Sequence, residues 1–171
     1  MKYLALLAIV STLASNLHAG EGQKVDLPAP EITAINQNGA PVNFAEVYKK
    51  GVTVVYFYPK ANTPGCTKQS CSLRDAYADL TKRGVQVLGV STDVPEAQKK
   101  FIADFTLPFD LIADPEGKVL EAFNVAKMPG KNLATRQCFV IKGGRIVWHD
   151  DKAATDKQAE DINRVLKDLG V

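Results

Sequence analysis

The sequence predicts an α/β fold in which a mixed central sheet is flanked by helices on both faces. In the middle of the chain, short apolar runs alternate with segments of helical periodicity, which is typical of strands and helices in alternation. Near the C-terminus, Lys142-Gly143-Gly144 predicts a hairpin turn between two further runs, and a helical pattern follows. Near the N-terminus, Asn38-Gly39 predicts a turn between two short strands. We therefore expect the sheet to include an N-terminal β-hairpin.

Each predicted element has a local reason. Residues 52–57 are almost wholly apolar, which is typical of a buried strand. Gly84 ends the helix that follows, and Pro95 lies in the first turn of the next one. The last helix has apolar residues at helical spacing, including Ile162 and Leu166.

The complete prediction can be written by residue range. Residues 20–30 are predicted to form an extended leader, and residues 124–135 a loop. Strands are predicted at 31–35, 42–44, 52–57, 85–91, 109–112, 136–141 and 145–148. Helices are predicted within 43–50 and at 67–83, 93–105, 119–123 and 155–169. This order of elements matches a thioredoxin-type architecture.

Length and charge limit the function. The chain has 171 residues, and its 46% hydrophobic content is enough for one packed domain. Lys and Arg together number 21 and Asp and Glu 19, and they are interspersed, so the net charge is only +2. This balance gives no reason to expect a nucleic-acid partner.

The first 19 residues differ from the rest and are interpreted as a secretory signal peptide. Lys2 is followed by an unbroken apolar run at 4–10, and Leu17-His18-Ala19 provides a cleavage site before Gly20. A membrane anchor or a plain N-terminal helix are the alternatives, but the apolar stretch is short for a span of about 20 residues. We therefore expect a mature domain at 20–171 that is periplasmic or otherwise exported, without stable membrane association after cleavage. Disulfides persist in such compartments.

The stretch from Tyr58 to Cys71 contains the predicted reactive residue. It joins the apolar strand to a helical pattern, so Cys66 lies where a helix begins. The free N–H groups and dipole of a helix N-terminus favour an anion such as a thiolate. Gly65 leaves space beside the sulfur, and Pro59 restricts the turn. We interpret Cys66 as a nucleophile; an inert buried cysteine is the alternative.

The same stretch resembles a known family. Pro59-x-x-x-Thr63-x-x-Cys66 resembles the active-site signature of peroxiredoxins, and residues 57–67 are similar to the bacterioferritin-comigratory (Q-type) subfamily. Cys71 lies where many members of that subfamily carry a second cysteine.

A second segment extends this resemblance. Arg136-x-x-Phe139-Val140-Ile141 resembles the strand that carries the family's distal arginine. The resemblance implies that Pro59, Thr63, Cys66 and Arg136 are active-site residues and that Cys71 is the resolving cysteine.

The resemblance also implies an activity, that of an atypical two-cysteine thiol peroxidase with a thioredoxin-like fold. Cys66 would be oxidised to a sulfenic acid by hydrogen peroxide or an organic hydroperoxide, and Cys71 would attack it to form an intramolecular disulfide. Arg136 and the Thr63 hydroxyl would interact with the thiolate, and Pro59 would shield the sulfenic acid from water. A thioredoxin-like or other dithiol reductant would then reduce the disulfide, in a reaction of antioxidant defence without a cofactor. We also expect a monomer.

This two-cysteine chemistry carries a geometric requirement. On a regular helix, residues five apart lie roughly 140° around and ~7.5 Å along the axis. A disulfide needs Cα atoms within about 7 Å and converging side chains. We therefore hypothesise that the first turns of this helix unwind when Cys66 and Cys71 bond.

Several alternatives remain open from the residues alone. Cys71 could be a core thiol on the helix, and Cys138 could be a core residue or a redox-active one. Gln69 could touch the site, but a solvated helix face is the favoured position for it. The Cys66-x₄-Cys71 spacing and the absence of Cys-x-x-Cys argue against a metal site and a disulfide reductase. A redox sensor or partner-binding module that switches shape, and a structural domain with a static disulfide, are the competing functions.

Overall fold

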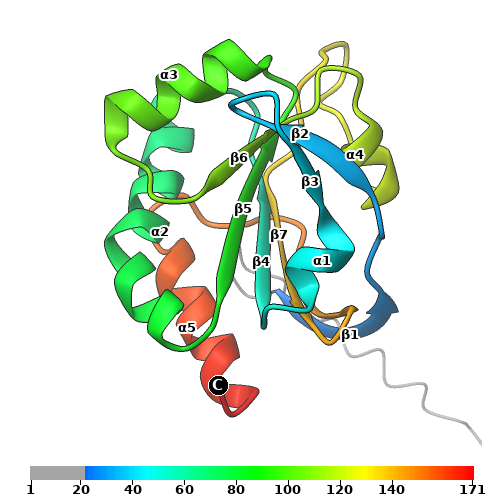
Figure 1. The fold of residues 1–171 in the computed structure, drawn as a ribbon, viewed down its shortest axis with the longest axis vertical. Coiled ribbons are helices and arrows are strands. Elements are labelled where there is room, and N and C mark those ends of the chain that lie inside the picture. Colours follow the sequence, from blue (N-terminus) through cyan, green and yellow to red (C-terminus); the bar gives the residue numbers. More distant parts are fainter. Residues whose placement is uncertain (1–21) are drawn as a thin grey trace, which may run out of the picture.

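The computed structural model describes residues 22–171 as one α/β fold built on an eight-stranded mixed sheet (Figure 1). The strands are β1 (Gln23–Pro28), β2 (Thr33–Asn36), β3 (Pro41–Asn43), β4 (Thr53–Phe57), β5 (Gln86–Ser91), β6 (Asp110–Ala113), β7 (Gln137–Lys142) and β8 (Arg145–Asp150). The helices are α1 (Phe44–Tyr48), α2 (Pro64–Lys82), α3 (Pro95–Phe105), α4 (Lys118–Ala122) and α5 (Gln158–Asp168). The predicted signal peptide lies outside the described residues.

The sheet order is β1-β8-β7-β4-β5-β6-β2-β3. Strands β4, β5 and β6 are parallel, because α2 and α3 cross over between them. Strand β7 pairs antiparallel with β4, and β8 pairs antiparallel with β7. The hairpin of β2 and β3 lies at one edge. The predicted mixed sheet and N-terminal hairpin are therefore confirmed.

Helices cover both faces of the sheet, and the side chains of β4 alternate between the two layers. Val54 and Tyr56 lie in the core cluster that contains residues of α2, α3 and α5. Val55 and Phe57 lie in the second cluster, with residues of α1 and α4. Figure 1 shows the same division, with α2 and α5 on the opposite side of the sheet from α1 and α4. Because every residue of β4 is buried, this central strand has a fixed place in the core, and the turn that follows it starts from that place.

The described part of the segment expected to be an extended leader, residues 22–30, contains a sheet strand that was not predicted. Gln23–Pro28 form β1, an edge strand paired antiparallel with β8. Almost all of β1 is exposed, so the strand lacks the apolar alternation by which a sequence indicates a strand. Pairing with β8, not local propensity, makes this segment a strand.

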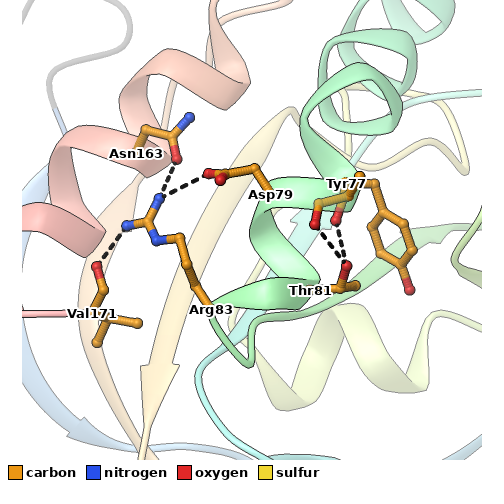
Figure 2. A network of polar contacts seen from close by, with 7 residues as sticks. Tyr77, Asp79, Thr81, Arg83, Asn163 and Val171 are labelled. Carbon is orange, nitrogen blue, oxygen red and sulfur yellow. Dashed lines mark hydrogen bonds and ion pairs between the residues drawn. The ribbon is translucent and has the colours of Figure 1, made fainter.

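The C-terminal half of α2 is attached to α5 by Arg83, the residue that follows the helix. Its guanidinium donates 2.7 Å hydrogen bonds to the Asn163 side chain and to the Val171 carbonyl, and it contacts Asp79 at 3.5 Å (Figure 2). Thr81 donates back to the Tyr77 carbonyl within the helix (Figure 2). This end of α2 is therefore held in place independently of the end that carries Cys66.

Within residues 22–171, no helix is both long and apolar enough to span a bilayer.

Candidate active site

Cys66 is the third residue of α2 and is only 1% exposed. Thr63, the residue before the first residue of α2, has an extended backbone, and its side chain makes no capping hydrogen bond. Pro64, the first helical residue, has no N–H. The first-turn N–H groups of Gly65 and Cys66 have no acceptor within the helix, so they can donate to an anion. The first turn of α2 carries no acidic residue. The helix end that holds the sulfur therefore favours negative charge.

Arg136 lies beside this sulfur. Its Nη2 donates to Cys66 Sγ over 3.4 Å, although the two residues are 70 positions apart. The sheet explains the proximity: β7 is antiparallel to β4, and Gln137, at the start of β7, pairs with Phe57, at the end of β4. Arg136 therefore reaches the same sheet edge as the turn that carries Cys66.

Gly65 leaves room for the guanidinium. A β-carbon at this position would lie 3.3 Å from Arg136 Nη2 and 3.6 Å from Thr155 Cγ2. The first of these distances is tighter than ordinary van der Waals contact. Glycine therefore lets Arg136 lie against the first turn of α2.

The expectation that Gln69 lies on a solvated helix face is wrong. Its side chain is 0% exposed, and its Oε1 accepts a hydrogen bond from Arg136 Nη1. Its Nε2 donates to Gln158 Oε1 over 2.8 Å. Gln69 follows Cys66 by three residues, a spacing that puts two side chains on one face of a helix. In the sequence, this three-residue spacing was the signal that could have placed Gln69 on the same helix face as Cys66.

Thr63 and Pro59 flank the sulfur in the chain. The Thr63 hydroxyl donates to the Lys60 carbonyl over 2.9 Å, and its backbone carbonyl accepts from Thr67 N–H. Pro59 is partly buried, two residues after the end of β4. Contact of the Thr63 hydroxyl with the thiolate, and shielding by Pro59, stay predictions.

Cys71 lies further along α2 and is partly exposed, and Cys66 and Cys71 are both free thiols. Because α2 is continuous through both residues, the helix geometry holds them apart in this state. Cys71 lines an open groove of about 620 Å³ between α2 and the start of α5, with Lys68, Asp75 and Glu160 among the other lining residues. The second cysteine is thus accessible from outside while the first is buried.

Cys138 has a different environment. It lies in β7 opposite Tyr56 and is 0% exposed. Burial raises the pKa of the Cys138 thiol well above its ordinary value, and the carboxylates of Asp150 and Asp161 raise it further. Among residues 22–171, no group of three or more His, Cys, Asp or Glu side chains could hold a metal ion.

Comparison with known proteins identifies the family. The sequence profile of the AhpC/TSA family matches residues 25–149, which is most of the chain. The chain belongs to the AhpC/TSA family.

Individual relatives place it among the Q-type peroxiredoxins of that family. It is 34% identical over 142 residues to the chloroplastic peroxiredoxin Q of Sedum lineare, covering 82% of this chain and 76% of that protein. The chain spans 62% to 66% of the length of other curated relatives it matches.

Solved structures agree. Peroxidoxin BcpB of Mycobacterium tuberculosis has a TM-score of 0.79 and 29% identity, covering 85% of this chain and 97% of that one. A structure of the bacterioferritin comigratory protein of Xanthomonas campestris has a TM-score of 0.78 and 26% identity, covering 87% of this chain and 100% of that one. It comes from a study of the alkyl peroxide reduction activity of that protein. The protein is therefore a peroxiredoxin with a thioredoxin-like fold, and it is an oxidoreductase of the peroxidase type.

Proposed function

We propose that this peroxiredoxin reduces hydrogen peroxide and organic hydroperoxides through Cys66, with Cys71 as the resolving thiol and an external dithiol as reductant. The observation that carries this proposal is the contact of Arg136 Nη2 with Cys66 Sγ at a helix N-terminus. A permanently charged guanidinium and the helix dipole both favour the thiolate, the form that attacks a peroxide.

In the first step, the Cys66 thiolate attacks the terminal peroxide oxygen. An S–O bond forms while the O–O bond breaks, and the leaving hydroxide or alkoxide takes up a proton. Negative charge grows on that leaving oxygen, and Arg136 with the first-turn N–H groups can stabilise it. The product is a Cys66 sulfenic acid and water or an alcohol.

In the second step, the Cys71 thiolate attacks the sulfenic sulfur and displaces hydroxide. The disulfide of Cys66 and Cys71 that results holds the two oxidising equivalents taken from the peroxide. A thioredoxin-like or other dithiol protein then returns two electrons by thiol–disulfide exchange. Cys71 is partly exposed in the reduced protein, which supports access of such a partner to its sulfur.

Cys138 is proposed to take no part in this cycle. Its thiol is buried, and the raised pKa keeps it protonated at neutral pH, so it lacks both the access and the thiolate that the chemistry needs.

The test is stopped-flow oxidation of the fully reduced protein by hydrogen peroxide. We expect the wild-type protein to react orders of magnitude faster than a free thiol, and Cys66→Ser to lose that reaction. In Cys71→Ser, oxidation should stop at the sulfenic acid, which mass mapping after one equivalent of peroxide will reveal. Peroxide reactivity that survives in Cys66→Ser would refute the proposal, and a disulfide inert to dithiols would favour a static structural role.

We also propose that the protein is exported and acts as a monomer without membrane attachment. Cleavage after Ala19 would leave β1 (Gln23–Pro28) whole, so the mature chain would keep its edge strand. N-terminal sequencing of protein from the exported fraction should give Gly20 as the first residue. Protein with an uncleaved N-terminus in the cytosolic fraction would contradict the proposed export.

A further inference from the structure

A buried polar connection runs from the reactive sulfur to the first residue of α5. Arg136 contacts Cys66 with one terminal nitrogen and Gln69 with the other. Gln69 contacts Gln158, the first residue of α5, over 2.8 Å. Gln69 and Gln158 are both 0% exposed. We propose that Gln158 is a positioning residue that orients the Arg136 guanidinium against Cys66 through Gln69; this inference rests on the function proposed above.

The direction of every bond in this connection follows from Arg136. A guanidinium can only donate hydrogen bonds, so the Gln69 atom that faces it must be the carbonyl oxygen. The Gln69 amide nitrogen then faces Gln158, and the Gln158 atom that meets it must also be an oxygen. An acceptor at position 158 therefore holds the Gln69 amide in the only orientation that accepts from Arg136.

Stability alone does not explain a glutamine at this position. Burying an amide costs free energy unless its hydrogen bonds are made. Gln158 Nε2 is buried without a hydrogen-bond partner in the described structure, so this side chain bears part of that cost. An apolar side chain at position 158 alone would remove this unpaired donor but would leave the buried Gln69 Nε2 without its acceptor. Apolar side chains at both positions would leave neither amide unpaired, but they would lack the acceptor for Arg136.

A second contact between the same helices provides a control. The backbone N–H of Ala159 donates to Ser72 Oγ over 3.1 Å, which also joins the start of α5 to α2. Ser72 takes no part in the connection from Cys66 through Arg136 and Gln69 to Gln158. Ser72→Ala therefore weakens the contact between the helices and leaves the guanidinium in place.

The experiment measures the second-order rate of peroxide with the reduced enzyme. We expect Gln158→Met to lower that rate about tenfold, the loss expected when one hydrogen bond to a charged group is weakened. Ser72→Ala should react at the wild-type rate. In an Arg136→Met background, Gln158→Met should have no further effect, because no guanidinium is left to orient.

Gln158→Glu tests the acceptor itself and covers the case in which Gln158→Met does not fold. Burial favours the neutral acid, whose carbonyl oxygen can accept from Gln69 as the amide does. We expect this variant to keep most of the wild-type rate.

Three results would overturn the positioning role: an unchanged rate in Gln158→Met, an equal loss in the Arg136→Met background, or a loss in Gln158→Glu as large as in Gln158→Met. A wild-type enzyme no faster than a free thiol would instead overturn the proposed function, and this inference with it.

Discussion

At the scale of single residues, the site depends on a glycine, Gly65, as well as on the charged Arg136. Arg136 provides the positive charge, and Gly65 leaves the space in which its guanidinium lies against the first turn of α2. A side chain at position 65 would therefore shift the guanidinium relative to the sulfur.

Gly65→Ala should separate stability from activity. Alanine in place of glycine in a helix stabilises by up to about 1 kcal/mol, so we expect a small rise in the free energy of unfolding. The added methyl group would meet Arg136 Nη2 at 3.3 Å and displace it. We expect the peroxide rate to fall about tenfold, since small misplacements of catalytic groups have large costs.

The control for this prediction removes the guanidinium. In an Arg136→Met background, Gly65→Ala should change stability but leave the peroxide rate as it is. Stopped-flow kinetics and denaturant unfolding of the four proteins measure both quantities. A Gly65→Ala enzyme as fast as wild type would show that the close contact has no catalytic consequence.

At the scale of elements, α2 must satisfy two requirements. It holds Cys66 at its N-terminus, and it must open if Cys66 and Cys71 are to bond. The contacts that hold its first half include core packing of Leu73 and side-chain hydrogen bonds of Tyr56 with Ser70 at 2.9 Å and of Gln69 with Gln158. The second half is held separately by Arg83 (Figure 2). Unwinding can therefore be confined to the first half.

Lys68→Gly tests this local unwinding. Lys68 is exposed and lies between the two cysteines, and glycine there weakens the native helix by about 1 kcal/mol. We expect the disulfide to form up to about fivefold faster after peroxide oxidation, because the helix opens more readily. Rapid-quench mass spectrometry of the disulfide measures this rate.

Two variants serve as controls for this prediction. Lys68→Ala removes the same charge and keeps the helix, and Ala78→Gly weakens α2 at an exposed position of its second half. Both should form the disulfide at the wild-type rate. Equal rates in Lys68→Gly and Lys68→Ala would argue against an unwinding step.

At the scale of the whole molecule, buried carboxyl groups connect stability to pH. Asp150 in β8 is 2% exposed; its Oδ1 accepts from Lys152 N–H, while its Oδ2 is buried without a hydrogen-bond partner in the described structure. Burial raises the pKa of Asp150 above its ordinary value of 3.8, and the neighbouring Asp151 raises it further. A carboxyl whose pKa is higher in the folded than in the unfolded protein contributes to the free energy of unfolding in its protonated form. That contribution is complete below pH 3.8 and is lost as the pH rises through the pKa of the folded state.

Asp150→Asn should therefore be more stable than wild type at pH 7. Asparagine keeps an oxygen for Lys152 N–H and cannot ionise, so the buried charge is gone. The difference should shrink as the pH falls towards 4, because the wild-type carboxyl takes up its proton. Denaturant midpoints at several pH values measure it, and a difference that widens on acidification would contradict this sign.

Much of the fold was predictable because its signals are local. The buried strand before Cys66, the helix after it and the two hairpins depend on apolar runs, periodicity and turn residues. Strand β1 was not predictable in this way, because its residues are mostly exposed and only β8 makes them a strand. Gln69 was misjudged for a related reason: its polarity indicated solvent, while its partners come from β7 and α5.

The sequence by itself determined that Cys66 lies at the start of a helix, because a strand, a tight turn and a helix start are encoded by adjacent residues. The resemblance of residues 136–141 to a peroxiredoxin strand predicted Arg136 beside the sulfur of that cysteine, but only the tertiary structure decided the geometry of this contact and the presence of Gln69 and Gln158. Arg136 reaches Cys66 through the antiparallel pairing of β7 with β4, and Gln158 reaches Gln69 through the packing of α5 on α2. Contacts between residues 70 or more positions apart depend on how the whole chain folds, and no local pattern encodes them.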